Sequence, residues 1–368
     1  MRVLQVVAEL GTGGAEAVVL GLAEGMASRG HRTWVASDRG WRVPLLAEVP
    51  GVDHVRVPLA PSGPVALAAS AARLLAWAPG RPVDIVHAHN IRATLAAHPV
   101  ARARRAPLVT TVHGLGAQDY PRAVRVLRRC SDLVVAVSDA VAEDLERAGL
   151  PKARIRVVEN SVSAPAVRPD DAAHLPDLPH LPASGPIVLC AARMTAQKRQ
   201  DLLLRGWAAR EHRTGHLLLA GDGPERPRHE ALARELGLGA DVTFLGDRDD
   251  VGALLRRADL LALPSDWEGL PIGVLEALAA DVPVLASAVG GLPDLADVLA
   301  LVPADGDDRE LGERWGRALD RELAGTAGQE QRQRTARGRA LVDTRFSPDR
   351  MVEAYLALDE ALVTSTYR

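Results

Sequence analysis

Short apolar runs alternate with longer helix-like segments along most of the chain. In the first half, helix-like sequence follows each of five runs, at residues 3–7, 33–36, 85–88, 108–112 and 133–137. Runs that are apolar throughout are typical of strands in a parallel sheet whose two faces are both covered by helices. The pattern therefore predicts an α/β fold with a doubly wound parallel sheet.

The alternation stops and restarts in the middle of the chain. Residues 163–185 are rich in proline and polar residues and have no periodicity, which is typical of a linker. Beyond them, apolar runs recur as PIVLCAA, HLLLAG, DVTFLG, DLLALP and VPVLAS. A chain of 368 residues is also long for a single core. We predict two Rossmann-like domains, 1–165 and 186–346, with a linker at 166–185.

Two shorter patterns add to this division. Residues 131–139 (SDLVVAVSD) and 258–266 (ADLLALPSD) align without a gap, as two similar domains would produce, although coincidence also explains an aspartate before an apolar strand. Near the end of the chain, Ser347 is a candidate N-cap, Pro348 suits the first helical position, and an apolar stripe follows. We predict a terminal helix at 347–368 that covers another surface.

Composition narrows the functional classes. Hydrophobic residues make up 47% and charged residues 25% of the chain, and its formal net charge of −3 lacks the basic excess of a nucleic-acid-binding protein. Cys130 and Cys190 lie beside apolar segments and indicate reduced thiols of a cytoplasmic protein. The most membrane-like segment, 64–78, is too short to span a bilayer and contains Arg73. We expect neither a nucleic-acid partner nor a membrane-spanning helix.

The most informative stretch is 265–295, in which Glu268 and Glu276 lie eight residues apart. Pro271 suits the first turn of a helix, so backbone N–H groups near Leu270 and Ile272 would face the loop and could hold an anion. A carboxylate binds the two hydroxyls of a vicinal diol, as in a hexose or a ribose. Each glutamate alone is as well explained by a solvated or capping role. Two carboxylates flanking an anion site, however, predict a nucleotide-sugar site.

Basic and polar residues follow other predicted strands. Arg193 and Lys198 come directly after the first strand of the second half, where a guanidinium and an ammonium can neutralise a diphosphate without a metal. A solvated helix start would explain the two residues as well. His113 ends the strand at 108–112 and could donate a hydrogen bond to a sugar hydroxyl, or serve a structural role.

The glycine-rich loop after the first strand, ELGTGGAE, is similar to a dinucleotide-binding loop. It lacks the third glycine of that motif, because Glu16 stands there, so an NAD-dependent oxidoreductase is disfavoured. Gly13 and Gly14 instead suit a close backbone approach to another ligand or domain. His87 and His89 are two residues apart and have no clear third partner, so we expect no metal site.

Together these motifs resemble the large retaining, nucleotide-sugar-dependent glycosyltransferase family of GT-B fold called glycosyltransferase family 4. The resemblance covers nearly the whole chain, and its most specific motif is EGLPIGVLE at 268–276. The other matching motifs are GGAE at 13–16, HAHN at 87–90, VHG at 112–114, VVENSV at 157–162, ARMTAQK at 192–198, LAGDGPE at 219–225 and FLG at 244–246.

The resemblance implies a role for each matching residue. Arg193 and Lys198 would bind the donor diphosphate, Glu276 the ribose, and Glu268 the transferred hexose, while His113 would reach the donor sugar. Of these, Glu268, His113, Arg193 and Lys198 would be the catalytic residues. Further donor contacts would come from Gly13, Gly14, Phe244, Leu245, Gly246, Gly269, Leu270, Pro271 and Ile272. The family fold would place two Rossmann-like domains across a cleft, with helix 347–368 crossing back onto the first domain.

The resemblance also implies the activity. We expect a retaining hexosyltransferase without metal or resident cofactor, with a UDP-sugar favoured over a GDP-sugar as donor, in cell-surface polysaccharide, glycolipid or natural-product synthesis. It would work in the cytoplasm, with peripheral contact at the inner face of the cell membrane left open.

The acceptor, a glycan, glycolipid or small molecule, would bind the N-terminal domain near 61–77, 101–105 or 122–129. The last two runs are basic and suit an anionic membrane, but equally a solvated helix. The alternatives are a sugar-nucleotide 2-epimerase of similar fold and a noncatalytic sugar-nucleotide-binding protein.

Two positions depart from the family pattern. Asp281 stands where glycine is frequent, but aspartate tolerates the left-handed conformation, so we expect the turn to be retained. Ser161 also replaces a frequent glycine, which puts only a loop contact in doubt.

Overall fold

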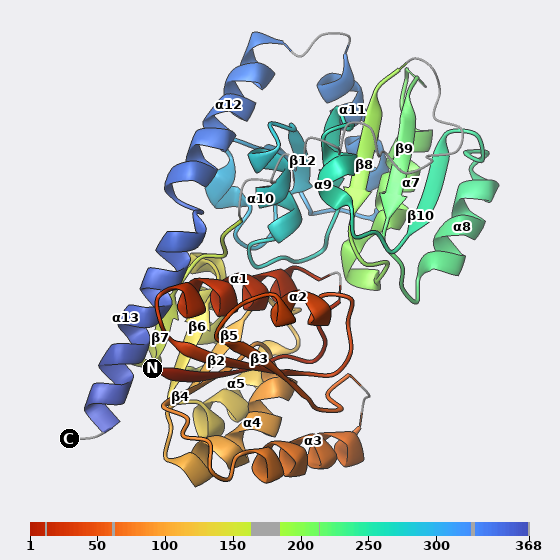
Figure 1. Cartoon of the computed structure of the whole chain (residues 1–368). Helices are drawn as coiled ribbons and strands as arrows, with labels where there is room; N and C mark the ends of the chain where they lie inside the picture. Colours follow the sequence, from red (N-terminus) through yellow and green to blue (C-terminus); the bar gives the residue numbers. More distant parts are fainter. Residues whose placement is uncertain (12, 61–62, 163–184, 213, 325–327, 367–368) are drawn as a thin grey trace. The chain divides into compact units, whose positions relative to one another are not determined.

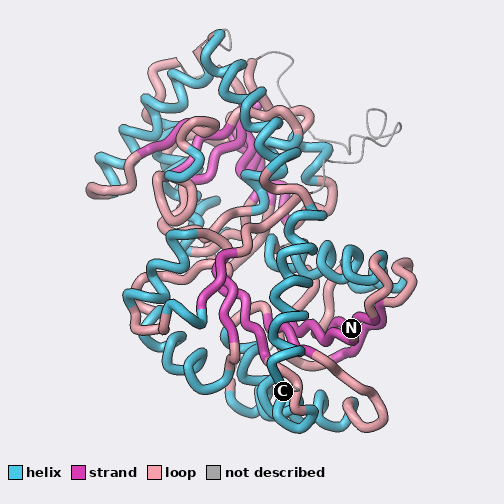
Figure 2. The backbone as a smooth tube through the Cα atoms, turned by 90° about the vertical axis from the view of Figure 1, so that its left-hand side faces the viewer, coloured by secondary structure: helices cyan, strands magenta, loops and turns pink. Residues whose placement is uncertain are grey.

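The computed structural model describes residues 1–11, 13–60, 63–162, 185–212, 214–324 and 328–366. The chain forms two compact units, one made of Met1–Ser161 with Ser347–Arg368 and the other of Val162–Phe346. Each unit is a parallel sheet with helices on both faces (Figures 1 and 2). The predicted linker lies outside the described residues except for Gly185.

The N-terminal unit contains a seven-stranded sheet in the order β3-β2-β1-β4-β5-β6-β7. Its strands are β1 (Arg2–Val6), β2 (Arg32–Ser37), β3 (Val52–Arg56), β4 (Ile85–Ala88), β5 (Leu108–Val112), β6 (Leu133–Ala136) and β7 (Ile155–Val157). The helices of this part of the chain are α1 (Gly14–Ser28), α2 (Val43–Ala47), α3 (Pro64–Trp77), α4 (Ile91–Arg104), α5 (Tyr120–Cys130) and α6 (Asp139–Arg147). The five predicted strands are present, whereas β3 and β7 were missed because exposed polar residues interrupt their short apolar pattern.

The terminal helix α13 (Pro348–Thr366) belongs to this unit. Its apolar side packs on α1, where Val352 lies so close to Gly25 that a Cβ there would sit 2.4 Å from Val352 Cγ2. Its polar side chains reach the sheet. Asp359 Oδ1 lies 2.9 Å from His87 Nε2, and Tyr355 Oη lies 2.8 Å from Thr111 Oγ1, with all four side chains buried. Buried hydrogen bonds therefore fix the helix to the strands beneath it.

The C-terminal unit contains a six-stranded sheet in the order β10-β9-β8-β11-β12-β13. Its strands are β8 (Ile187–Ala191), β9 (His216–Ala220), β10 (Val242–Gly246), β11 (Leu260–Leu263), β12 (Val284–Ser287) and β13 (Ala300–Val302). Its described helices are α7 (Gln200–Ala208), α8 (Arg226–Glu235), α9 (Val251–Leu255), α10 (Ile272–Ala279), α11 (Asp308–Leu323) and α12 (Gln329–Thr344). All pairings in this sheet are parallel, as the continuous apolar runs predicted.

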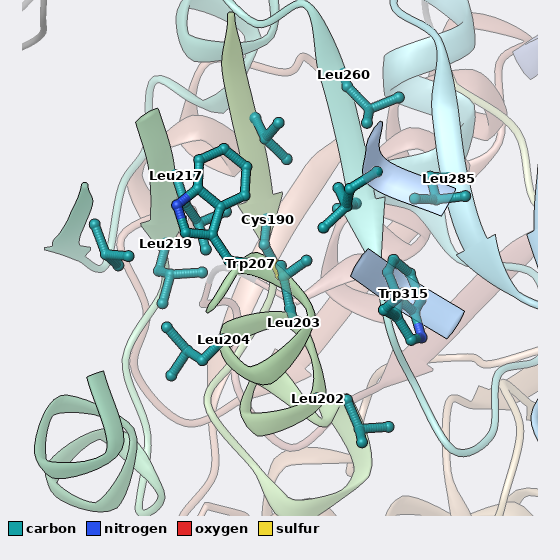
Figure 3. Packing of buried hydrophobic residues seen from close by; sticks show 14 of the residues in the cluster. Cys190, Leu202, Leu203, Leu204, Trp207, Leu217, Leu219, Leu260, Leu285 and Trp315 are labelled. Atoms are coloured by element: carbon teal, nitrogen blue, oxygen red, sulfur yellow. The ribbon is translucent and has the colours of Figure 1, made fainter. Parts of the chain in front are cut away.

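The core of the C-terminal unit lies between β8 and its neighbours on one side and α7 and α11 on the other. Figure 3 shows Trp207 and Trp315 packed with leucines of the strands around Cys190. Burial raises the pKa of the Cys190 thiol to about 12. Cys130 is half-buried, and both cysteines are free, as expected.

Three aspartates fix the starts of neighbouring strands in the same way. The Asp132 backbone N–H donates to the Leu108 carbonyl, while its carboxylate accepts from the Leu108 N–H, each at 2.8 Å. Asp259 repeats this arrangement with Ile187, and Asp84 repeats it with Arg2. The aligned segments at 131–139 and 258–266 therefore share local geometry. They are not equivalent in topology, because β11 occupies the place of β4 in the other sheet and β6 does not.

Candidate functional site

The C-terminal unit brings two of the predicted residues into direct contact. Lys198 follows β8 in a short 3-10 turn, and Glu268 follows β11, which is hydrogen-bonded to β8. Lys198 Nζ lies 2.5 Å from Glu268 Oε1. The strand order reverses between β8 and β11, and ligands of open parallel sheets bind outside the carboxyl ends of the strands at such a point. The pair therefore marks the position where a ligand is expected.

Glu268 is held in one orientation by a second donor. Its Oε1 accepts a hydrogen bond of 2.6 Å from the hydroxyl of Ser265, which is buried. Only 6% of the Glu268 side chain is exposed, against 20% for Lys198. Since Oε1 takes both bonds, Oε2 is the oxygen that can accept from a ligand hydroxyl. The ammonium of Lys198 has three N–H donors and can bind phosphate oxygens with the remaining two.

The loop that carries Glu268 is fixed by its backbone. A Cβ at Gly290, where φ is +56°, would lie 1.8 Å from the carbonyl oxygen of Glu268. The Gly291 N–H donates to the Gly269 carbonyl at 3.0 Å. Gly290 is therefore required by the close packing of two loops. On the other side, Gln197 Nε2 donates to the Trp267 carbonyl at 2.8 Å.

Helix α10 starts beside this loop and supplies uncapped backbone groups. Pro271 is its N-cap, with extended φ and ψ of −72° and 126°, and makes no side-chain capping bond. The helix thus begins one residue later than predicted, at Ile272, and the N–H of the buried Leu270 is not one of its terminal N–H groups. A Cβ at Gly273 would lie 3.7 Å from the Ala191 carbonyl, so the first turn faces the carboxyl end of β8. An anion is favoured at such a helix start.

Glu276 lies on the same face of α10 as Gly273. Between Ile272 and Ala279, Gly273 and Glu276 are the two positions that are not fully buried, and they are three residues apart. Residues three apart are neighbours on a helix surface. Glu276 is therefore placed on the face that looks toward the end of β8, as a ribose ligand there would require.

Arg193 and Arg199 differ in how they are held. Arg193 is exposed, and its carbonyl accepts from Thr195 N–H at 3.0 Å, so the backbone of the β8 loop is fixed there. Arg199 has a left-handed φ of 47° and pairs with three carboxylates, those of Asp201, Asp266 and Asp308. Burial opposes its charge, but these carboxylates raise the pKa of Arg199 overall. These ion pairs of Arg199 stabilise the turn that contains Lys198. The sequence analysis did not identify Arg199 as a site residue.

The predicted base-binding segment ends the edge strand β10. The register slips between Phe244 and Gly246, and Gly246 has a left-handed φ of +69°. Its carbonyl accepts from the Gly221 N–H at 2.7 Å, which joins it to the loop after β9. Phe244, Leu245 and Gly246 are half-buried, so their backbone forms part of the same strand-end edge as Lys198.

In the N-terminal unit, Gly13 caps α1 and Gly14 begins it. Arg42 holds this loop, because its Nη1 donates to the carbonyls of Gly11 and Gly13. A Cβ at Gly13 would fall 2.1 Å from Oε2 of Glu16, which folds back over the helix start. The acidic residue that replaces the third glycine thus occupies the N3 position of α1, in its first turn.

His113 lies at the carboxyl end of β5 and stacks on His89, which follows β4. Their ring centroids are 5.9 Å apart, and the planes meet at 23°. Burial lowers the pKa of His113 to about 4. Burial, followed by the charges of His113 and His87, lowers the pKa of His89 well below its ordinary value. Both rings are therefore neutral at physiological pH, and His89 is a neighbour of His113 that the sequence did not identify.

Lys198 is also unusual in this chain. The sequence has 44 lysines and arginines, yet Lys152 and Lys198 are its only lysines. A lysine ammonium is a compact point charge, while an arginine presents a planar fork. Lys198 therefore places such a compact charge beside Glu268.

The described residues contain neither a metal-binding cluster nor a membrane-spanning helix. No three His, Cys, Asp or Glu side chains in the described ranges are grouped so that they could hold a metal ion. Within the same ranges, no helix has the length and apolarity to cross a membrane.

Comparison with solved structures defines the class of fold. The HepE protein of Anabaena, solved in complex with UDP and glucose, superposes with a TM-score of 0.81 at 22% identity, covering 98% of this chain and 100% of that one. Sucrose-phosphate synthase from Thermosynechococcus elongatus gives a TM-score of 0.84 at 23% identity, covering 99% and 100%. Two Rossmann-like parallel-sheet domains with these neighbours are the GT-B fold.

Sequence comparison supplies the family. The model described as Glycosyltransferase Family 4 matches residues 12–164, and that of Glycosyl transferases group 1 matches residues 179–335. D-inositol 3-phosphate glycosyltransferase of Mycobacterium tuberculosis is 32% identical over 300 residues, which cover 74% of this chain. The match spans 61% of the length of that relative. The chain belongs to glycosyltransferase family 4.

Proposed function

We propose that the protein is a retaining glycosyltransferase that moves a hexose from a UDP-sugar to a hydroxyl of its acceptor, without a metal ion. The observation that carries the proposal is the Lys198–Glu268 contact of 2.5 Å at the point where the strand order of the sheet reverses. The contact holds Lys198, the cation for the diphosphate, directly against Glu268, the carboxylate for the sugar. The choice of UDP is supported by the UDP complexes of the structural neighbour HepE.

In this proposal, the donor diphosphate lies between Lys198, Arg193 and the start of α10. These groups place fixed positive charge and dipoles where negative charge develops on the leaving group. The bond between the anomeric carbon and the diphosphate oxygen breaks, and the acceptor oxygen bonds to that carbon on the same face. The acceptor proton passes to the departing phosphate oxygen. Positive charge supplied by the protein performs the task for which other enzymes use a metal ion.

The remaining residues position the donor. Oε2 of Glu268 accepts from the hexose hydroxyls, and Glu276 holds the ribose diol from the neighbouring face of α10. His113, neutral because its pKa is about 4, can donate one hydrogen bond to the donor sugar. The backbone at 244–246 meets the base, and Gly13 and Gly14 approach the donor from the N-terminal unit. The acceptor, a glycan, glycolipid or small molecule in the cytoplasm or at its membrane face, binds the N-terminal unit.

A donor panel tests the proposal. UDP-, GDP-, ADP- and dTDP-sugars are compared for thermal stabilisation of the full chain, because a ligand at about 100 times its Kd adds roughly 2.7 kcal/mol to stability. We expect UDP-sugars to stabilise most. Amine-reactive labelling followed by peptide mass mapping should show that UDP protects Lys198 and leaves Lys152 unprotected. Equal labelling of both lysines at saturating UDP would contradict the site.

The reaction itself is tested with the donor that binds best. NMR of the product should show that the anomeric configuration is retained, and EDTA should leave the rate unchanged. An inverted product, or a rate abolished by EDTA and restored by Mn²⁺, would refute the proposed mechanism. Turnover of the donor without any acceptor would instead indicate an epimerase.

A further inference from the structure

A polar cavity lies in the N-terminal unit, at the opposite end of the sheet from His113. Its volume is about 440 Å³, within the range of roughly 300–1,000 Å³ typical of ligand pockets. It opens beside Leu108 and Asp132, at the amino ends of β5 and β6, and between the last turns of α4 and α5. The strand-end residues assigned to the donor lie elsewhere in the fold.

Arginines dominate the lining of this cavity. Four of them, Arg102, Arg128, Arg129 and Arg154, face one aspartate, Asp132. The Asp132 carboxylate is already bound to the Leu108 N–H at 2.8 Å. In the part of the chain that the structure describes, no carboxylate forms an ion pair with Arg102, Arg128 or Arg129. The cavity thus gathers positive charge that the protein itself does not neutralise.

Stabilisation of helix ends does not account for all four arginines. A cation near a helix C-terminus does interact favourably with the helix dipole, and each such cation stabilises the helix by about 0.3–1 kcal/mol. At the C-terminus of α5, however, Arg154 already supplies the stabilising positive charge, because its guanidinium donates to the carbonyls of Leu127, Arg128 and Ser131. Arg128 and Arg129 are exposed and free to turn to a ligand. His98 lines the same cavity, and its Nδ1 lies 3.2 Å from the Cys130 carbonyl.

We propose that this cavity binds a phosphate-bearing anion, with Arg102, Arg128 and Arg129 as its ligands. Guanidinium groups bind phosphate oxygens in pairs of parallel hydrogen bonds, and several of them around one polar cavity match the charge of a phosphomonoester. The basic runs at 101–105 and 122–129, which the sequence offered as candidate acceptor or membrane contacts, meet here. The site is separate from the donor site and does not depend on the proposed transfer reaction.

Two charge-matched variants test the site. Arg128→Ala/Arg129→Ala removes two ligands, while Arg122→Ala/Arg125→Ala removes two exposed arginines from the same helix that do not line the cavity. Binding of inorganic phosphate is measured by titration calorimetry in low salt, where the unchanged donor site contributes equally to the wild type and to both variants. We expect the control to bind as the wild type does and the cavity variant to bind at least about tenfold more weakly. Equal affinity in the two variants, or no binding to the wild type at millimolar phosphate, would overturn the proposal.

A readout in the wild type makes the test independent of how the variants fold. Cys130 lines the cavity, whereas Cys190 lies in the core of the other unit. Phosphate should therefore slow alkylation of Cys130 by iodoacetamide at pH 8.5, and an unchanged rate at saturating phosphate would contradict the site. Vesicles with and without phosphatidylglycerol then separate the sources of the anion. Binding that needs phosphatidylglycerol and is lost in Arg128→Ala/Arg129→Ala identifies a lipid headgroup, and phosphate binding without vesicle binding identifies a free phosphate ester.

Discussion

The two units share a topology and differ in what they place at the carboxyl ends of equivalent strands. By position in the sheet, β1 corresponds to β8, and β4 corresponds to β11. After β8 and β11 come Lys198 and Glu268, which form an ion pair. After β1 and β4 come the Gly13 loop and the neutral ring of His89. The same switch point thus carries a lysine–glutamate ion pair in one unit, and a glycine loop beside neutral imidazoles in the other.

In the proposed function, this difference gives the two units different parts of the donor to recognise. A charged side chain that is held in place by an ion pair suits a charged portion of the ligand, such as a diphosphate. Glycines and neutral imidazoles suit hydroxyl groups, because they allow close approach and offer hydrogen bonds without attracting an anion. The strand ends therefore predict which half of a nucleotide sugar each unit recognises.

The largest expected effect is on the charged switch point. Lys198→Ala and Glu268→Ala should each lower kcat/KM for transfer by about 10²–10³, the range found when one group that stabilises developing charge is removed. Lys152→Ala, which removes the other lysine, serves as the control and should retain the wild-type rate. Because the two groups act as one unit, the double variant should lose much less than the product of the single losses. Transfer close to the wild-type rate in either single variant would refute the site.

The loop packing around Glu268 should be the next most sensitive feature. Gly290→Ala combines a left-handed φ with a Cβ only 1.8 Å from the Glu268 carbonyl oxygen, so the loop must move. We expect a loss of about 3 kcal/mol in unfolding free energy and a large loss of transfer. Gly30→Ala in the other unit has φ of +80° but open space around it, and should cost about 1–2 kcal/mol without affecting transfer. Urea unfolding and initial rates measure both, and equal losses of stability in the two variants would contradict the proposed packing.

Sequence patterns predicted the helices and strands better than they predicted the contacts between residues that are distant in sequence. Continuous apolar runs identify buried parallel strands because both faces of such a sheet are covered, so the order of elements could be predicted. Amphipathic edge strands such as β3 lack that signal and were missed. The left-handed turn at Asp281, with φ of 57°, was predicted correctly because that conformation depends on local residue type.

Contacts between distant residues carry no local signal. Ser265 and Glu268 are close in sequence, but their bond to Lys198 depends on the pairing of β8 with β11. Likewise, His89 meets His113 only because β4 and β5 are neighbours in the sheet. The predicted site residues came from chemistry at strand ends, and their partners required the topology.

The neutral switch point should appear in the pH dependence of stability. In the unfolded chain His89 and His113 have ordinary pKa values near 6.5, while folding lowers both. Below pH 6.5 the unfolded chain therefore binds more protons, so their contribution to stability is complete above that pH and is lost as the pH falls toward about 4.

His113→Asn should flatten this dependence by up to about 1.4 kcal/mol per pH unit, the value for one proton. The measurement is the difference in urea unfolding free energy between variant and wild type from pH 6.5 to 4.5, which cancels the carboxylates common to both. Asparagine keeps an N–H donor, so transfer at pH 7.5 should fall only about tenfold. Identical slopes in variant and wild type would mean that His113 is not held neutral.

The smallest expected effect compares the equivalent helices α4 and α10, which both end at a residue other than glycine in the left-handed region. Arg105 has φ of 55° and Asp281 has φ of 57°. In both, the next N–H donates to a carbonyl of the last helical turn, Ala106 to the Ala101 carbonyl at 3.0 Å and Val282 to the Ala277 carbonyl at 2.9 Å.

Aspartate tolerates the left-handed conformation better than arginine. Arg105→Gly should therefore gain about 1 kcal/mol and Asp281→Gly about half as much, as measured by urea unfolding. A larger gain at Asp281 would show that contacts outside the helix end, such as the 3.8 Å approach of Arg339, decide its conformation.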